Sequence, residues 1–201
     1  RLQALMEALA ADGHDIHHLD LGGGLGISYL DEAPPQPEAF GRAVNEQLGD
    51  WPGRLIFEPG RVIAGNAGVF VTEVLYTKAQ PDKRFAIVDG AMNDLMRPAL
   101  YSAEQRIRPV TESPSETGVQ AVDVVGPICE SGDFLGKDRA LPPLAAGDRL
   151  AVMSAGAYGA TMASNYNTRP RAPEVLVDGD RFEGVRGRET IDQLLANERI
   201  P

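Results

Sequence analysis

The stretch GVFVTEVLYTKA, residues 68–79, marks a change in the character of the chain. It is rich in β-branched and aromatic residues, which favour strands. Similar runs, separated by turn residues, follow it: RFAIVDG from Arg84, VQAVDVVG from Val119, RLAVMSAG from Arg149 and EVLVDGDRFEGVR from Glu174. We therefore predict an antiparallel β domain, a sandwich or a barrel, over residues 66–201. Asp178-Gly179 is its expected hairpin turn, because both residues tolerate positive φ, and RETIDQLLANE is its last helix.

A different period precedes residue 66. Leu2, Leu5, Met6 and Leu9 recur at helical spacing up to Gly13, and the short strand-like run IHHLDL follows. The same order then repeats: Phe40, Val44 and Leu48 share one helical face, and RLIF begins at Arg54. This order predicts αβαβ, a part of a parallel α/β sheet or barrel over residues 1–65.

Composition excludes several classes of function. The chain of 201 residues is 43% hydrophobic and 24% charged, which is typical of a globular protein. Its formal net charge of −10 disfavours nucleic acid and anionic membranes as partners. The single cysteine, and the lack of a charged and apolar leader, favour the cytoplasm. His14, His17 and His18 have no companions at metal-ligand spacing, so no metal site is expected.

Two loops of the first part carry candidate chemistry. LDLGGGLG, residues 19–26, places four glycines after a strand, where they can present backbone N–H groups to a phosphate. The alternative is a flexible turn. FEPGR, residues 57–61, places a carboxylate and an arginine at the end of the next strand, which suits a charged ligand. Alternatively, Glu58 and Arg61 simply pair with each other.

Three segments of the second part carry further candidates. Arg97 and Tyr101 lie in DGAMNDLMRPALY, and arginine matches the geometry of a carboxylate. Tyr158 lies between small residues, where a backbone can approach a ligand closely. The lone Cys129 is followed by Glu130 in GPICESGD. The alternatives are an exposed arginine, a turn tyrosine and a cysteine buried as a small apolar residue.

In the order GGGLG, EPGR, DGAMNDLMRPALY, GPICESGD and AYG..MASNYN, these motifs span nearly the whole chain. Together they resemble diaminopimelate decarboxylase, in the fold III group of pyridoxal-phosphate decarboxylases. The resemblance implies that residues 1–65 are the C-terminal part of a cofactor-binding TIM barrel. The β domain follows this barrel. It also implies decarboxylation of meso-2,6-diaminopimelate to L-lysine and CO2, in a homodimer with shared active sites.

The resemblance also implies roles for individual residues. The cofactor, pyridoxal 5′-phosphate, is expected to be held by Gly23, Gly24, Glu58, Gly60, Arg61 and Tyr158. The glycine N–H groups hold its phosphate, and the charge of Glu58 keeps its ring nitrogen protonated. The substrate is expected to contact Arg61, Arg97, Tyr101, Glu130 and Tyr158. Arg61 and Arg97 are expected to bind its distal carboxylate, and Glu130 is expected to pair with its distal ammonium. Cys129, which would reach the active site from the partner subunit, is expected to reprotonate the α-carbon.

One departure from the family's pattern concerns the lysine that binds the cofactor as a Schiff base. Lys78, Lys83 and Lys137 all lie in the β part, in contexts that do not match it. We therefore expect this polypeptide alone not to form the Schiff base. Two alternatives remain: a fold III decarboxylase of ornithine, arginine or carboxynorspermidine, and a non-catalytic piece that dimerises with a full-length relative.

Overall fold

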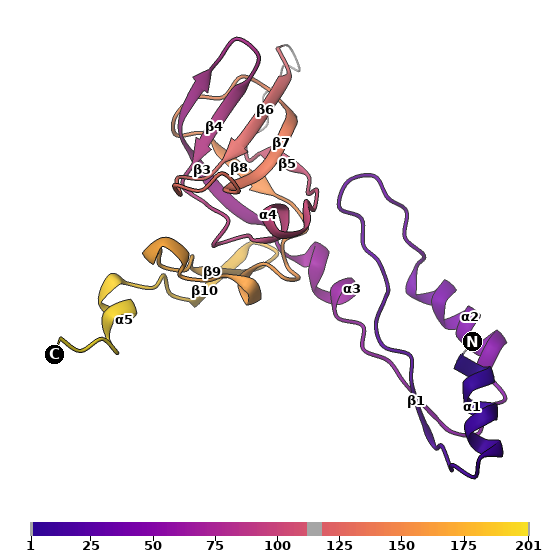
Figure 1. Ribbon diagram of the computed structural model, residues 1–201. Helices are drawn as coiled ribbons and strands as arrows, with labels where there is room; N and C mark the ends of the chain where they lie inside the picture. The colour runs from indigo at the N-terminus through magenta and orange to yellow at the C-terminus, as the bar shows by residue number, and fades with distance from the viewer. Residues whose placement is uncertain (1, 112–117, 201) are drawn as a thin grey trace. The chain divides into compact units, whose positions relative to one another are not determined.

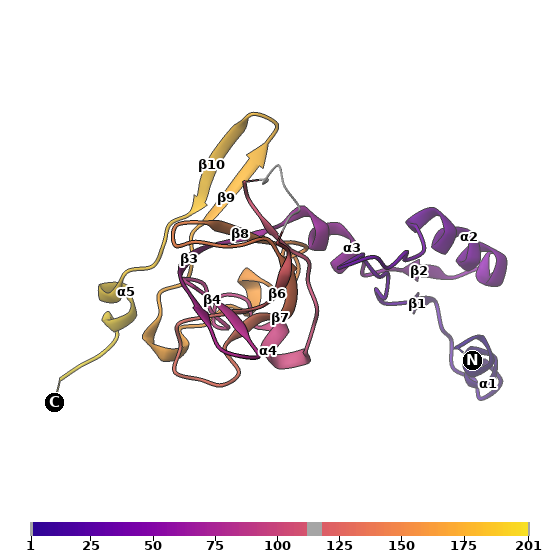
Figure 2. The same ribbon diagram turned by 90° about the horizontal axis from the view of Figure 1, so that it is seen from above.

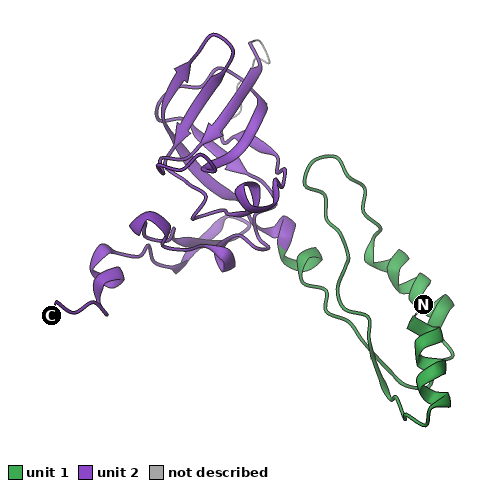
Figure 3. Cartoon of the chain, viewed as in Figure 1, with its two compact units in different colours: residues 1–64 green, residues 65–201 purple. Residues whose placement is uncertain are grey.

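The computed structural model describes residues 2–111 and 118–200. The chain divides into two compact units, residues 1–64 and 65–201 (Figure 3).

The first unit alternates helices and short strands. Its elements are α1 (Leu2–Ala11), β1 (His18–Asp20), α2 (Pro37–Leu48), β2 (Arg54–Ile56) and α3 (Arg61–Ala64). β1 and β2 pair in parallel, with Leu19 opposite Leu55. The predicted αβαβ order is therefore confirmed.

Helix α1 ends in a glycine cap at Gly13, as the sequence predicts. Strong helix formers fill LQALMEALAA, and Gly13 follows with a φ of 90°. The N–H of His14 donates to the Leu9 carbonyl and that of Gly13 to the Ala10 carbonyl, both at 3.0 Å. This pair of hydrogen bonds satisfies carbonyls that the helix end leaves unpaired.

The second unit is dominated by one six-stranded sheet, in the order β5-β8-β3-β4-β6-β7. Its strands are β3 (Phe70–Ala79), β4 (Arg84–Val88), β5 (Ile107–Pro109), β6 (Gln120–Val125), β7 (Phe134–Leu141) and β8 (Arg149–Val152). The short helix α4 (Arg97–Tyr101) lies between β4 and β5, and the one-turn helices η1 (Gly65–Ala67), η2 (Ala160–Met162) and η3 (Tyr166–Thr168) lie in loops.

The sheet curls until it nearly closes into a barrel (Figures 1 and 2). Its two outer strands meet: a Cβ on Gly136 of β7 would stand 2.9 Å from the Cδ1 of Ile107 in β5. The barrel interior holds a single cluster of apolar side chains. Its fully enclosed members include Val74, Ala86, Val88, Val124, Leu135, Leu150 and Val152. Burial of these side chains is the main favourable contribution to the folding of this unit.

The β part differs from the prediction in three ways. The sheet is mixed and barrel-like, because β4 and β6 pair in parallel while its other neighbours are antiparallel. Two strands, β5 and β7, lie in segments that were not predicted as strands. The hairpin turn is also displaced by one residue: Asp178 pairs with Arg181, so Gly179 and Asp180 form the loop. Gly179 has a φ of 63°, which suits the first position of a type II′ turn.

A hairpin and a final helix end the chain. The hairpin joins β9 (Glu174–Asp178) to β10 (Arg181–Arg186). Helix α5 (Ile191–Leu195) confirms the predicted last helix and begins with a capping box, in which Thr190 and Gln193 exchange side-chain to backbone hydrogen bonds. In the described part of the chain, no helix combines the length and apolarity needed to cross a membrane.

An ion pair between a buried aspartate and a half-exposed lysine ties together the strands at one side of the sheet. Asp123 on β6 is 5% exposed and accepts hydrogen bonds from the Nζ of Lys83 and the N–H of Asp138, each at 2.8 Å. Burial by itself would raise the pKa of Asp123, but the Lys83 and Asp138 hydrogen bonds together outweigh it and hold this pKa below its usual value. The ionised carboxylate therefore stabilises the fold.

We expect Asp123→Asn to lower the free energy of unfolding by about 1–2 kcal/mol at neutral pH. Because the pKa of Asp123 is depressed in the folded protein, its contribution is present above the ordinary value of 3.8 and is lost as the pH falls below it. Urea unfolding between about pH 5 and pH 2 should therefore show a smaller acid-induced loss of stability in the variant than in the wild type. Equal losses in the two proteins would contradict the assignment.

Candidate functional site

The glycine loop and the FEPGR loop of the first unit lie side by side. They follow the paired strands β1 and β2, and the strand-like hydrogen bonding continues into them. The Leu21 N–H donates to the Ile56 carbonyl at 3.0 Å, and the Glu58 N–H donates to the Gly22 carbonyl at 2.9 Å. The parallel pairing of the two strands therefore brings Gly23 and Gly24 next to Glu58.

This pair of loops requires glycine at several positions. Gly22 and Gly24 have φ values of 65° and 85°, in the left-handed region. A Cβ on Gly23 would stand 2.6 Å from the Glu58 carbonyl oxygen, so no side chain fits there without movement. The Gly22 N–H is fixed by the Asp20 carboxylate at 2.7 Å. A partly exposed loop lined by glycines suits a phosphate group, and the exposed Glu58 carboxylate beside it suits a cationic ring.

Arg97 of the second unit is flanked by two aromatic rings. Its guanidinium carbon lies 5.8 Å from the centre of the Tyr101 ring and 5.5 Å from that of Tyr158. Tyr101 follows one helical turn later in α4, whereas Tyr158 comes from a distant loop. Two cation–π contacts stabilise the position of this guanidinium, a group whose planar fork matches the geometry of a carboxylate. The structure therefore brings three of the predicted substrate residues together.

Tyr158 has a strained backbone in a tightly docked loop. Its φ is 58°, which is uncommon for a residue with a Cβ. Two backbone hydrogen bonds anchor this loop to the start of the unit. The Ala155 N–H donates to the Gly68 carbonyl at 2.8 Å, and the Gly156 N–H donates to the Gly65 carbonyl at 3.0 Å. Such conformations cost about 1–3 kcal/mol and persist where surrounding contacts enforce them.

Cys129 and Glu130 lie on the loop between β6 and β7, and both are exposed. The exposed thiol contradicts the alternative of a buried apolar cysteine. One oxygen of Glu130 accepts the Gly132 N–H at 3.1 Å, and the other accepts the Tyr166 hydroxyl at 3.5 Å. The base of this loop is occupied by Asp133, which is 4% exposed.

The predicted site residues thus fall into three groups. The first unit carries Gly23, Gly24, Glu58, Gly60 and Arg61 on neighbouring loops, and α3 begins at Arg61. The second unit carries the cluster of Arg97, Tyr101 and Tyr158, and separately the loop of Cys129 and Glu130. The roles of these residues stay predictions.

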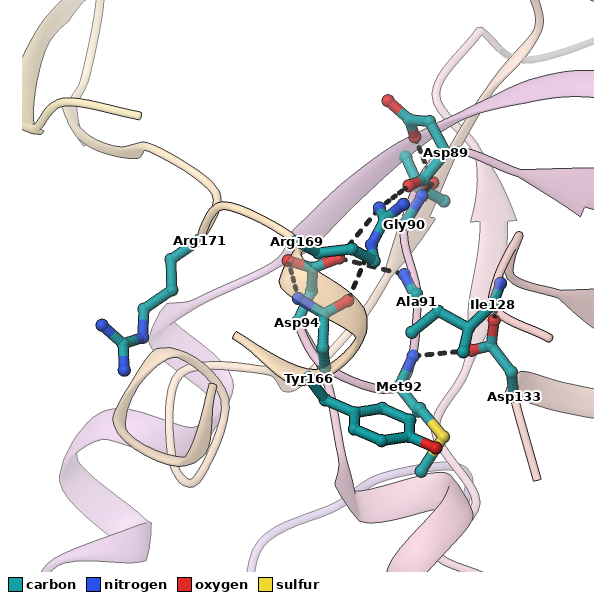
Figure 4. A network of polar contacts seen from close by, with 12 residues as sticks. Asp89, Gly90, Ala91, Met92, Asp94, Ile128, Asp133, Tyr166, Arg169 and Arg171 are labelled. Carbon is teal, nitrogen blue, oxygen red and sulfur yellow. Dashed lines mark hydrogen bonds and ion pairs between the residues drawn. The ribbon is translucent and has the colours of Figure 1, made fainter. Parts of the chain in front are cut away.

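Sequence reasoning missed the polar residues that support these loops. Arg169 donates to Asn93 Oδ1 at 2.9 Å and to the Asp89 carbonyl at 2.5 Å, and lies 3.7 Å from the Asp94 carboxylate (Figure 4). Burial raises the pKa of Asp94 above its usual value, which the Ala91 N–H and the Arg169 charge only partly offset. In the sequence, Asp94 and Arg169 are visible only as charged residues among turn residues. That pattern does not show which residue each of them contacts.

The chain matches a known protein family over most of its length. A model described as "Pyridoxal-dependent decarboxylase, C-terminal sheet domain" matches residues 11–156. The chain therefore belongs to the pyridoxal-dependent decarboxylases.

Within this family, the chain is homologous to diaminopimelate decarboxylase. It is 55% identical to the enzyme of that name from Vibrio cholerae, over 100% of this chain and 48% of the relative. The crystal structure of the Helicobacter pylori enzyme complexed with L-lysine matches with 39% identity and a TM-score of 0.87, over 97% of this chain and 48% of that one. The structure from M. jannaschii in complex with L-lysine matches with 34% identity and a TM-score of 0.91, over 99% and 46%. The chain thus spans about half the length of these relatives.

We expect Gly23→Ala to raise the Kd for pyridoxal 5′-phosphate about tenfold or more, which corresponds to about 1.4 kcal/mol. The added Cβ would meet the Glu58 carbonyl, so the two loops must separate and the phosphate cradle must distort. The Kd is measured by absorbance titration: the cofactor is first removed from the complete protein and then added back. Gly41→Ala is the control, because a Cβ there in α2 meets nothing within 4 Å. Equal Kd values in the two variants would contradict the cradle.

Proposed function

We propose that the protein containing this chain is a pyridoxal-phosphate-dependent enzyme that decarboxylates meso-2,6-diaminopimelate to L-lysine and CO2. The observation that carries the proposal is Arg97, held between the rings of Tyr101 and Tyr158. A fixed guanidinium suits a substrate with a second carboxylate. The 55% identity to a diaminopimelate decarboxylase over the whole chain supports the same substrate.

The first unit would contribute to the cofactor site. Gly23 and Gly24 would present backbone N–H groups to the cofactor phosphate, helped by Gly60 and Arg61 and by the hydroxyl of Tyr158. Glu58 would pair with the ring nitrogen, and its negative charge would favour the protonated form of that ring. When bound, pyridoxal phosphate supplies an electron sink for the electron pair that the departing CO2 leaves behind.

The distal end of the substrate would be recognised by complementary charges. Arg97 and Arg61 would bind the distal carboxylate, with the hydroxyls of Tyr101 and Tyr158 as further donors. Glu130 would pair with the distal ammonium. A substrate that lacks the distal carboxylate could not form these charge-assisted hydrogen bonds, which gives the site its selectivity.

Cys129 would supply the proton that replaces CO2 at the α-carbon. Its thiol is exposed, so it is accessible to a substrate. A thiol can act as a general acid that gives up a proton and recovers one. The neighbouring Glu130 would fix the substrate's far end from the same loop.

The proposal extends to architecture and assembly. We propose that residues 1–65 are the C-terminal part of a cofactor-binding TIM barrel and that residues 66–201 are the β domain. The complete protein would act in the cytoplasm as a homodimer with shared active sites, in which Cys129 reaches the site of the partner subunit.

The test is an assay of the protein purified from its native source and supplied with pyridoxal phosphate. Diaminopimelate, ornithine and arginine are offered separately, and CO2 and the amine product are quantified by mass spectrometry. We expect CO2 and lysine from diaminopimelate alone. Formation of putrescine from ornithine, or of agmatine from arginine, would instead assign another decarboxylase of the same group. No turnover of any substrate would overturn the enzymatic assignment.

We expect Arg97→Ala to raise the KM for diaminopimelate about 10- to 100-fold, because the charge-assisted hydrogen bonds to its distal carboxylate are lost. Steady-state kinetics of the holoenzyme measure this. Arg181→Ala is the matched control, since Arg181 also pairs with a carboxylate but its side chain is 81% exposed on the β9–β10 hairpin. An unchanged KM in Arg97→Ala would count against diaminopimelate as the substrate.

A further inference from the structure

The loop that carries Cys129 and Glu130 is closed at its base by backbone hydrogen bonds. The Gly126 N–H donates to the Asp133 carbonyl at 3.2 Å, and the Asp133 N–H donates to the Glu130 carbonyl at 3.0 Å. The loop tip itself is exposed. Its shape therefore depends on what fills and anchors the base.

The Asp133 carboxylate fills the base of the loop. Its Oδ2 accepts the Ile128 N–H and its Oδ1 accepts the Met92 N–H, each at 2.7 Å (Figure 4). Gly126 packs so closely on this carboxylate that a Cβ there would overlap it. Two short hydrogen bonds to one carboxyl group hold the residue just before Cys129 and connect it to a segment far away in sequence.

That distant segment is anchored in turn. Asn93, which follows Met92, is fully buried and exchanges hydrogen bonds with Ser164: its Nδ2 donates to the Ser164 carbonyl at 3.1 Å and its carbonyl accepts the Ser164 N–H at 2.9 Å. Arg169 adds a bond to the Asn93 side chain at 2.9 Å. Residues 164–169 are thus fixed at both ends on the loop that Asp133 contacts.

Tyr166 lies between these two anchors and reaches back to the first loop. Two neighbours of Tyr166, Asn167 and Thr168, have φ values of 60° and 55°, a strained conformation that the anchors enforce. The Tyr166 hydroxyl donates to Glu130 Oε2 at 3.5 Å. The contacts therefore form a ring that starts at Asp133, passes through Asn93 and Tyr166, and returns to Glu130.

We propose that Asp133 and Tyr166 are positioning residues for the reaction, an inference that rests on the proposed function. Asp133 sets the conformation of the loop and so places the Cys129 thiol and the Glu130 carboxylate together. Tyr166 sets only the orientation of Glu130, and thereby the recognition of the substrate's distal ammonium. One buried carboxylate thus governs both proton transfer and specificity.

The decisive experiment compares Asp133→Asn with Asp123→Asn in the holoenzyme. Both aspartates are at most 5% exposed and each accepts two hydrogen bonds, so both variants lose stability. An asparagine offers one acceptor oxygen and would face the second N–H with its own amide group. We expect kcat for diaminopimelate to fall about 10- to 100-fold in Asp133→Asn and to stay at the wild-type value in Asp123→Asn, because small displacements of catalytic groups cost that much.

Hydrogen exchange measured by mass spectrometry gives a readout that does not need turnover. Amides of the segment 126–132 should exchange about tenfold faster or more in Asp133→Asn than in Asp123→Asn, because the loop has lost its anchor. Identical exchange and identical kinetics in the two variants would overturn the proposal. If the wild-type protein does not decarboxylate diaminopimelate, the proposed function fails, whereas the exchange comparison still decides whether Asp133 holds the loop.

Tyr166→Phe removes only a hydroxyl from a side chain that is 46% exposed, so this variant should fold even if Asp133→Asn does not. We expect its KM for diaminopimelate to rise about threefold to tenfold with little change in kcat, since a single hydrogen bond to Glu130 is lost. An unchanged KM overturns the role of Tyr166.

Discussion

The near closure of the six-stranded sheet is the constraint on which the rest of the second unit depends. The outer strands approach closely at Gly136 of β7, where a Cβ would stand 2.9 Å from the Cδ1 of Ile107 in β5. Closure buries one apolar cluster and leaves few open sheet edges. Loops that leave the ends of these strands, including those of Arg97, Cys129 and Tyr158, are therefore held on a rigid frame, as precise chemistry requires.

Polar contacts then define the loops that the barrel alone would leave mobile. The carboxylates of Asp94 and Asp133 are nearly buried and are satisfied by backbone N–H groups. Buried polar groups of this kind specify one conformation, because any other arrangement would leave them unpaired. The positive φ values of Tyr158 and Asn167 lie in these loops, so local strain accompanies the contacts that maintain it.

Local sequence patterns predicted most of the elements but not how they pair. Helix α1 and strands β3, β4, β6, β8, β9 and β10 lie within the segments predicted for them, and α2 contains the predicted helical face of Phe40, Val44 and Leu48. β5 has three residues and β7 contains a glycine and three charged residues, so neither carries a strong strand pattern. The parallel pairing of β4 and β6 is likewise invisible in a periodicity, which reports the exposed and buried faces of a strand and not its neighbours.

The sequence by itself determined the motifs, their order and the family that they resemble, because glycine, proline and charged residues have local chemical meanings at short spacing. Only the tertiary structure decided that Arg97 lies between two tyrosines and that Asp133 is the acceptor for Met92, which is 41 positions away. The aspartate of CESGD has the same letters around it whether it is exposed or buried. The partners of Asp133 reach it only when distant strands pack together, and no local sequence pattern predicts that long-range packing.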